Sequence, residues 1–222
     1  MTARPAVPLA RRVDDIDETM IRTMYDLAEQ QSGDLVRLEI GEPDFDTPEH
    51  IVEAAAAAAR DGATHYTHNA GLPALRAAIA EKMERDHDLS IEPSQVIAAA
   101  GATEALYLTL LTTAERGDEV VLPTPAWPQY RLQIQLAGAT PVEVALSAAD
   151  DFDLDVDRVV DAIGDDTACV VLNSPSNPTS QVYDPEAVEA VVEAAAEHDA
   201  VSRPTSTRTT SSSSTPARSS TR

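Results

Sequence analysis

Apolar runs of strand length alternate with segments of helical period from residue 94 onward. Gly, Pro and Asn bound the apolar runs, and Pro123 and Pro125 are expected to end the second of them. The predicted strands are 96–100, 119–122, 140–144 and 168–173, and the predicted helices are 102–115, 127–137, 155–163 and 185–198. Such alternation builds βαβ units on a mostly parallel sheet, with ligand sites at the carboxyl ends of the strands. The predicted fold class is therefore α/β.

The pattern upstream of residue 94 is helical and less regular. Thr47 and Pro48 are typical of an N-cap and a first helical position, and they predict a helix over 49–60. A second helix is predicted from Pro73 to about residue 86. We therefore expect residues 1–93 to form an N-terminal arm and a helical connecting layer, and residues 94–200 to form part of an α/β domain.

Residues 201–222 differ in kind from the rest of the chain. Fourteen of the 22 are Ser or Thr, four are Arg and none is acidic. Such a segment buries too little apolar area to offset its ordering entropy, so we expect it to be disordered. A natural linker or phosphorylatable tail is one interpretation. We favour a frame-shifted or truncated reading, because the composition changes abruptly after Ala200.

The charge of the chain is strongly acidic and unevenly spread. The 222 residues include 16 Lys and Arg against 38 Asp and Glu, for a net charge of −22. All 38 acids precede residue 201, so residues 1–200 carry −26 and the last 22 carry +4. An acidic surface repels phosphate backbones and anionic lipids, which disfavours nucleic-acid and membrane binding. It also suits a salt-rich cytosol, where screening reduces self-repulsion.

The single cysteine and the N-terminal sequence bear on the compartment. Cys169 lies in the apolar run 168–172 without a disulfide partner, which predicts a buried thiol in a reducing compartment. Residues 1–15 contain no apolar signal region, and no segment is predicted to span a membrane. We therefore expect a cytoplasmic protein.

Four loop segments hold the candidate chemistry, although each alone is also typical of an ordinary turn. They are 41–45, 65–71, 100–104 and 173–180. In 100–104, the first N–H groups of the following helix make an anion cradle to which Thr103 adds a hydroxyl. Asn173 and Asn177 follow a strand at its carboxyl end. His65 and His68 have no second ligand cluster beside them, so no metal site is predicted.

The order and spacing of these motifs suggest a family. The set comprises 41–48, Tyr66 with Gly71 and Pro73, 101–106, 117–120, 125–130 and 177–179. Together they resemble the N-terminal half of class I/II aminotransferases, which are pyridoxal 5′-phosphate (PLP) enzymes of the aspartate aminotransferase fold, over residues 10 to 200. The resemblance implies an incomplete large domain with a parallel sheet.

The resemblance also implies which residues bind the cofactor. Gly101, Ala102 and Thr103 match the family's phosphate cradle, in agreement with the helix N-terminus noted above. Trp127 matches the aromatic residue that stacks on the pyridine ring. Asn177 matches the asparagine that donates to the cofactor's phenolic oxygen.

Further roles follow from the same resemblance. Gly41 matches the residue whose backbone contacts the substrate carboxylate, beside Trp127 and Asn177. Tyr66 matches the tyrosine that reaches the cofactor phosphate of the neighbouring subunit, which implies a homodimer acting on an amino acid and a 2-oxo acid. Ser180 replaces the last glycine of the family's Asn-Pro-Thr-Gly, at a position expected to favour positive φ.

The part of the family that this chain resembles does not include the family's catalytic groups. Its Schiff-base lysine, its aspartate on the pyridinium nitrogen and its carboxylate-binding arginine lie downstream of the helix that ends here at His198. The single lysine, Lys82, is predicted to be a solvated surface ammonium. We therefore assign no catalytic residue and expect a truncated aminotransferase that is inactive alone.

Other functions stay open. A non-catalytic module could bind PLP or phosphate, or pair with full-length subunits. A nucleotide-binding α/β domain is disfavoured because 100–104 has neither a Walker lysine nor a three-glycine fingerprint. Trp127 favours the aspartate-type branch, but aromatic, alanine and histidinol-phosphate aminotransferases and C–S lyases share this half, so the sequence does not determine the amino acid.

Overall fold

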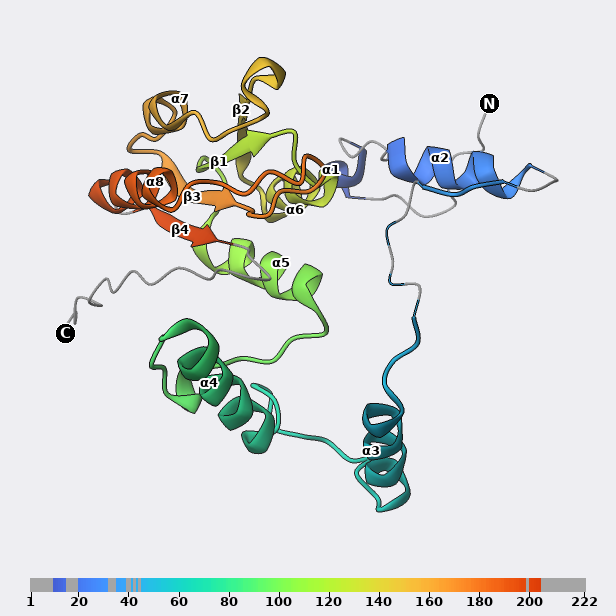
Figure 1. Cartoon of the computed structure of the whole chain (residues 1–222). Coiled ribbons are helices and arrows are strands. Elements are labelled where there is room, and N and C mark those ends of the chain that lie inside the picture. Colours follow the sequence, from blue (N-terminus) through green and yellow to red (C-terminus); the bar gives the residue numbers. More distant parts are fainter. Residues whose placement is uncertain are drawn as a thin grey trace. The chain divides into compact units, whose positions relative to one another are not determined.

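The computed structural model describes residues 10–14, 20–31, 35–38, 41, 43, 45–198 and 200–204 (Figure 1). The chain divides into two compact units, Met1–Asn69 and Ala70–Arg222. The domain boundaries expected from the sequence, 1–93, 94–200 and 201–222, stay a prediction. None of the helices in the described ranges is long and apolar enough to cross a membrane.

The described residues of the N-terminal unit form the helices α1 (Arg11–Asp14), α2 (Met20–Glu29) and α3 (Glu49–Arg60). The prediction of a helix over 49–60 is confirmed. The expected capping is wrong by one residue, because Pro48 is the N-cap, at φ −52° and ψ 134°, and makes no side-chain cap. Its ψ lies outside the helical region, so helical geometry begins at Glu49. The helix α3 buries none of its residues within this unit.

The second unit begins with the helix α4 (Pro73–His87) and the short 3₁₀ helix η1 (Pro93–Gln95). The predicted strand over 96–100 does not form: Val96 is extended, but the segment joins no strand of the described sheet. Ala98 N–H donates instead to the Ala70 carbonyl at 2.9 Å. Gly71, at φ 99°, permits this approach, since a Cβ there would lie 2.7 Å from that of Ala98. A strand needs a neighbour to pair with, and none of the described strands lies beside this segment.

The sheet has four parallel strands in the order β2-β1-β3-β4. They are β1 (Glu119–Thr124), β2 (Thr140–Ala145), β3 (Thr167–Leu172) and β4 (Val201–Pro204). The predicted parallel α/β architecture is confirmed. The expected end of β1 is wrong, because the strand continues through Pro123 to Thr124. Its ladder to β3 runs only from Glu119 to Val121, so Pro123 is paired through its register with β2 alone.

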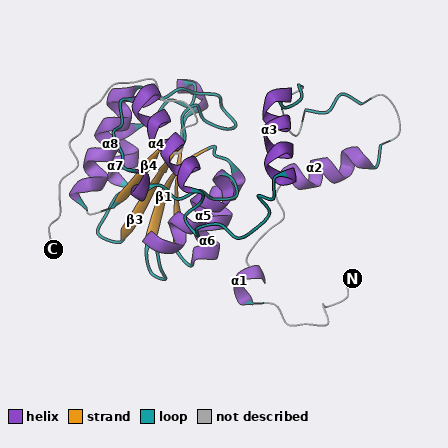
Figure 2. Cartoon of the chain, turned by 90° about the horizontal axis from the view of Figure 1, so that it is seen from below, coloured by secondary structure: helices purple, strands orange, loops and turns teal. Residues whose placement is uncertain are grey.

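Helices cover both faces of this sheet (Figure 2). The connecting helices are α5 (Ala102–Thr113), α6 (Pro128–Ala137), the 3₁₀ helix η2 (Ala148–Asp150), α7 (Val156–Asp161) and α8 (Pro185–Glu197). Val120 and Leu122 of β1 pack with the buried residues of α5 and α6. Val121, between them, packs with the buried residues of α7 and α8 on the other face. The alternation follows the two-residue period of a strand.

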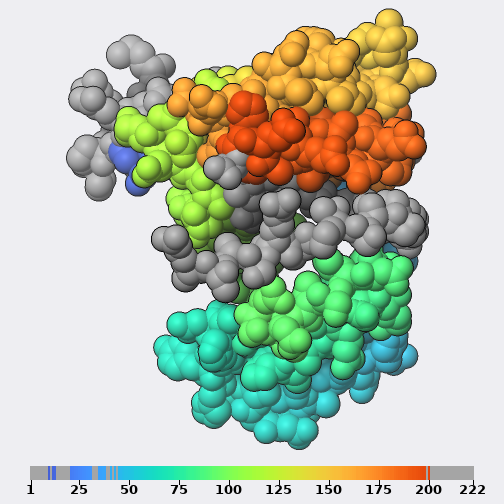
Figure 3. All heavy atoms as spheres, turned by 90° about the vertical axis from the view of Figure 1, so that its left-hand side faces the viewer, coloured from blue at the N-terminus to red at the C-terminus, as the bar shows by residue number. Residues whose placement is uncertain are grey.

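The two layers of the core are closely packed. Leu110 of α5 and Ile134 of α6 are fully buried against one face, and Val159 of α7 and Val191 of α8 against the other. Full burial of such a side chain contributes roughly 1.5–3 kcal/mol each. In the space-filling view of Figure 3, α8 in red-orange lies against the α7 region in lighter orange, in agreement with the contacts between these helices.

The C-terminal segment departs from the expectation of disorder. Val201–Pro204 forms β4 and pairs in parallel with Cys169–Leu172 of β3. Backbone hydrogen bonds of a ladder order a segment whatever its side chains, so composition alone misjudged these four residues. The strand–helix alternation therefore continues past Ala200, and residues 205–222 lie outside the described residues.

Candidate functional site

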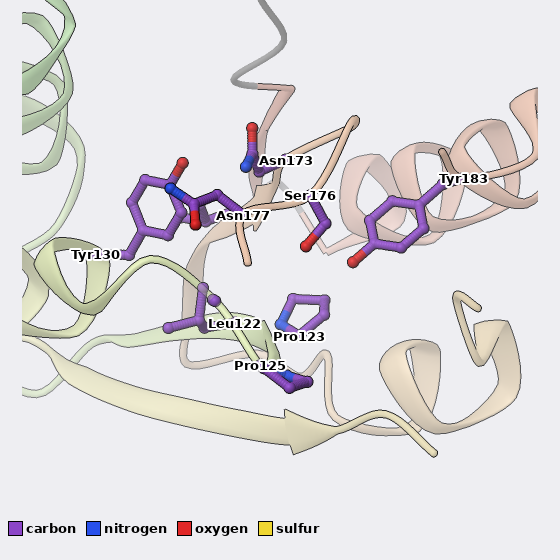
Figure 4. A pocket seen from close by; sticks show the side chains of 10 residues that line it. Leu122, Pro123, Pro125, Tyr130, Asn173, Ser176, Asn177 and Tyr183 are labelled. Atoms are coloured by element: carbon purple, nitrogen blue, oxygen red, sulfur yellow. The ribbon is translucent and has the colours of Figure 1, made fainter. Parts of the chain in front are cut away.

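A solvent-open hollow lies at the carboxyl ends of β1 and β3, where a parallel sheet is expected to bind ligands (Figure 4). The empty space within its walls, open solvent included, is about 220 Å³. Its lining comes from β1 and the segment after it, from α6, from β3 and from the loop that follows β3. The lining residues are Leu122, Pro123, Pro125, Ala126, Tyr130, Val171, Asn173, Ser176, Asn177 and Tyr183.

The loop after β3 presents Asn177 at this hollow on a frame of internal hydrogen bonds. Ser176 N–H donates to the Gln181 carbonyl at 2.8 Å, and Ser180 N–H donates to the Ser176 carbonyl at 2.9 Å. Ser180 has φ 60°, so the predicted positive φ is confirmed. Asn177 lies at the exposed turn of this frame and lines the hollow, which gives its amide a defined place at the carboxyl end of β3.

Tyr183 anchors the other end of the same loop. Its side chain is only 5% exposed, and its backbone N–H donates to Ser174 Oγ at 3.0 Å. Burial raises the pKa of the Tyr183 phenol, a hydrogen bond with Ser176 works in the opposite direction, and the charge of Asp153 raises it further. Figure 4 shows the Ser176 hydroxyl and the Tyr183 phenol pointing toward each other below the loop. The phenol is therefore held neutral and fixes the loop from inside.

The N-terminus of α5 is the predicted anion cradle. Gly101 is its N-cap, at φ 90° and ψ 171°, a backbone conformation that favours glycine. Ala102 and Thr103 open the helix, and its first N–H groups have no intrahelical acceptor. The Glu104 carboxylate accepts a hydrogen bond from Ala100 N–H and so closes the turn that leads into the helix.

The helix α6 connects the cradle with the hollow. Trp127 is its N-cap, and its ring meets that of Tyr130 edge to face, with centroids 5.4 Å apart and planes at 80°. Tyr130 lines the hollow. Further along the same helix, Gln133 Nε2 donates to the Thr103 carbonyl at 3.0 Å. One helix thus touches both the hollow and the first turn of α5.

The predicted site residues are divided between the two units. Gly101, Ala102, Thr103, Trp127 and Asn177 all belong to the second unit. Gly41 and Tyr66 belong to the N-terminal unit, where the Tyr66 side chain is fully exposed. The binding roles of all seven stay predictions. Lys82 lies on α4 with its side chain 60% exposed and paired with Asp86, so the expected surface position is confirmed.

Several residues at the site were not singled out by the sequence. Tyr130 had a signal, since it follows Trp127 by three positions on the same helix. Gln133, Ser176 and Tyr183 had none, because their importance depends on contacts that the linear pattern does not contain. Cys169 is buried and free, as expected, with Thr113 Oγ1 3.1 Å from its sulfur. Within the described ranges, no group of three or more His, Cys, Asp or Glu could hold a metal ion.

The donor set fits a phosphate-bearing aromatic ring. The helix N-terminus and the Thr103 hydroxyl are suited to a dianionic phosphate. Trp127 offers a flat apolar face, and the Asn177 amide can donate to an oxygen on the ring. The chain's only lysine does not line the hollow, so these groups supply binding rather than covalent attachment.

Comparison with known proteins agrees with this geometry. The sequence profile of "Aminotransferase class I and II" matches residues 33–202. The chain is 37% identical over 193 residues to a "Probable aspartate aminotransferase" of Methanocaldococcus jannaschii, covering 87% of this chain and 50% of that protein. It is 44% identical over 170 residues to an "Aspartate/prephenate aminotransferase" of Thermus thermophilus, covering 77% and 44%.

Solved structures give the same result. The aspartate aminotransferase from Thermus thermophilus with maleate superposes with a TM-score of 0.85 at 38% identity, covering 90% of this chain and 53% of that one. An alanine aminotransferase from Pyrococcus furiosus superposes with a TM-score of 0.83 at 32% identity. The chain spans about half the length of the curated relatives that it matches.

Proposed function

Because the chain belongs to the class I and II aminotransferase family, we propose that it forms the cofactor-binding part of a PLP-dependent transaminase. The whole enzyme would move an amino group from an amino acid to a 2-oxo acid. The observation that carries this proposal is that the α5 N-terminus and the hollow lined by Asn177 and Tyr130 belong to one unit, with the Tyr130 ring against that of Trp127. When bound, PLP supplies an electron sink for bonds at the substrate Cα.

The residues of this chain would bind and orient the cofactor. The N–H groups at the start of α5 and the Thr103 hydroxyl would hold the phosphate, where the helix dipole favours negative charge. Trp127 would cover one face of the ring and exclude water from it. Asn177 would donate to the phenolic oxygen and fix the tilt of the ring, on the loop that Tyr183 anchors.

Residues of the N-terminal unit would complete the site. In this proposal Gly41 contacts the substrate carboxylate through its backbone, and Tyr66 reaches the phosphate bound by a second copy of the chain. Full exposure of the Tyr66 side chain in its own unit is compatible with such a role. The proposal therefore includes a homodimer, and the acidic composition supports a cytoplasmic location at high salt.

The substrate proposed is a dicarboxylic amino acid of the aspartate type. The names of the relatives support this class, since most of those described above act on aspartate by name. The residues that line the hollow are apolar or neutral. None of them therefore offers a fixed positive charge to the side chain of the substrate amino acid. The aspartate assignment thus rests on the relatives.

A second candidate is a non-catalytic module that pairs with other subunits. Large apolar side chains remain exposed around α5: Ile97 is 71% exposed, Leu108 44% and Leu111 46%. Exposed apolar groups that lie near one another are typical of surfaces that another chain covers. Co-purification with an intact aminotransferase subunit would support this candidate.

The test of the first proposal uses the only tryptophan as its reporter. The chain contains one Trp, at position 127, so quenching of its fluorescence by PLP reports binding at the proposed stacking position. We expect saturable quenching that inorganic phosphate competes away and that pyridoxal, which lacks the phosphate, produces only at higher concentration. Borohydride reduction should leave no stoichiometric adduct on Lys82.

Two results would overturn the proposal. Quenching that does not saturate would mean that Trp127 does not border a PLP site. Equal affinity for PLP and pyridoxal would mean that the start of α5 does not hold the phosphate. A stoichiometric reducible adduct on Lys82 would contradict the part of the proposal in which this chain binds PLP without covalent attachment.

A further inference from the structure

Gln133 is a buried polar side chain whose presence the stability of the fold does not explain. Its side chain is 5% exposed on α6, within the apolar layer between the sheet and the helices α5 and α6. Its Nε2 donates to the Thr103 carbonyl, but its Oε1 is buried without a hydrogen-bond partner in the described part of the chain. A buried acceptor without a partner is destabilising, so an apolar residue of similar length would suit the core better.

The hydrogen bond of Gln133 acts on one peptide plane. The Thr103 carbonyl and the Glu104 N–H belong to the same planar group, so fixing the first fixes the second. This N–H is among the first-turn donors of α5 that have no intrahelical acceptor. An amide donor on the carbonyl also polarises the peptide and strengthens its N–H as a donor.

The approach to α5 makes this contact more important. The segment 96–100 enters the helix without a ladder to any described strand, so the sheet does not hold the N-terminus of α5 in place. Among the described residues, Gln133 makes a side-chain hydrogen bond that joins the first turn of α5 to another helix. Because Trp127 is the N-cap of α6, the same helix contacts the cradle and carries the proposed ring-stacking residue.

We propose that Gln133 is a positioning residue for the phosphate: it orients the 103–104 peptide so that the first turn of α5 is ready to bind an anion. This inference rests on the proposed function. It gives a role to a side chain whose buried Oε1 lacks a partner among the described residues. It also predicts that removal of this side chain weakens PLP binding without lowering the stability of the fold.

The test compares Gln133→Met with Gln135→Met. Methionine keeps the length of the side chain at 133 while removing both the donor and the unpartnered acceptor. Gln135 lies on the same helix, is only half-buried and makes no side-chain hydrogen bond to a described residue, so it is the matched control. We expect Gln133→Met to leave the unfolding midpoint unchanged or higher and to weaken PLP binding about tenfold, as measured by Trp127 quenching. Gln135→Met should change neither.

Hydrogen exchange adds a readout that does not depend on PLP. In Gln133→Met, the amides of residues 102–105 should exchange faster, while those of β1 and β3 stay unchanged. In the unmodified chain, inorganic phosphate should slow exchange at 102–105 and at the Gln133 side-chain amide together. Slowing at 102–105 without any effect on that amide would overturn the proposal, even if the variant failed to fold.

The remaining outcomes are also distinct. Equal PLP affinity in Gln133→Met and the unmodified chain would overturn the role of Gln133 while leaving the proposed function intact. A parallel fall in affinity and in unfolding midpoint, with faster exchange across the whole unit, would show a purely structural role. Absence of PLP binding to the unmodified chain would overturn the proposed function itself.

Discussion

Ser180 places a Cβ in the left-handed region, and replacing it with glycine should stabilise the protein. Its φ is 60°, it is exposed, and its backbone N–H bonds to the Ser176 carbonyl at 2.9 Å. A residue with a Cβ loses about 1–2 kcal/mol in this conformation relative to glycine. Glycine in turn loses about 0.5–1 kcal/mol more chain entropy on folding. The difference predicts a gain of about 0.5–1 kcal/mol for Ser180→Gly.

Urea unfolding at pH 7 measures this gain as a higher midpoint at an unchanged m-value. The corresponding rise in the thermal midpoint is about 1–4 °C for a chain of this size. Ser180→Ala is the control, because alanine keeps the Cβ and hence the unfavourable φ. A lower midpoint in Ser180→Gly, or an equal rise in Ser180→Ala, would show that the backbone conformation of this loop is not the source of the effect.

Two further predictions concern ionisable side chains. Burial raises the pKa of Tyr183, so its neutral form stabilises the fold below the ordinary tyrosine pKa of about 10, and this contribution is lost as the pH rises toward the folded value. Tyr183→Phe should therefore lower the free energy of unfolding at pH 8 by about 0.5–1.5 kcal/mol, because the hydrogen bond to Ser176 is lost. Above pH 10 its urea midpoint should decline less steeply than that of the unmodified chain. Parallel pH profiles for the two proteins would refute this. Hydrogen bonds from Lys82, and then from Arg85, lower the pKa of Asp86 to about 2. Carboxyl NMR titration of Lys82→Met should show that pKa rising toward 3.8 with no change in thermal midpoint, and an unmoved Asp86 would contradict the ion pair.

The sequence pattern predicted the local elements well and the non-local pairing poorly. The helix over 49–60 and the parallel strands after residue 118 agree with the structure because their apolar period and their Gly and Pro boundaries are local signals. The strand expected over 96–100 has equally strong local signals but no neighbour in the described sheet. Val201–Pro204 shows the converse, since β3 offers a partner to a segment whose composition predicts disorder.

The residues of the candidate site show the same difference between local and non-local signals. Gly101, Thr103, Trp127 and Asn177 were named because helix starts and strand ends are visible in the sequence, and the family resemblance gave each a role. Gln133 could not be named, because its contact with Thr103 joins positions 30 residues apart across two helices. Tyr183 and Ser176 lie close in sequence, but only the burial of the phenol makes their contact important. Residues that act by positioning other residues therefore have no recognisable pattern in the sequence.

The helix α5 unites these observations, because side chains hold both of its ends and segment 96–100 before it forms no strand. Toward its C-terminus, Leu110 is buried and the Thr113 hydroxyl lies 3.1 Å from the Cys169 sulfur on β3. At its N-terminus, Gln133 holds the Thr103 carbonyl. The ladder between β1 and β3 fixes the hollow, and α6 links that hollow to the start of α5. Phosphate recognition in this chain should therefore depend on the packing of α5 against α6, and segment 96–100 need not join the sheet for it to occur.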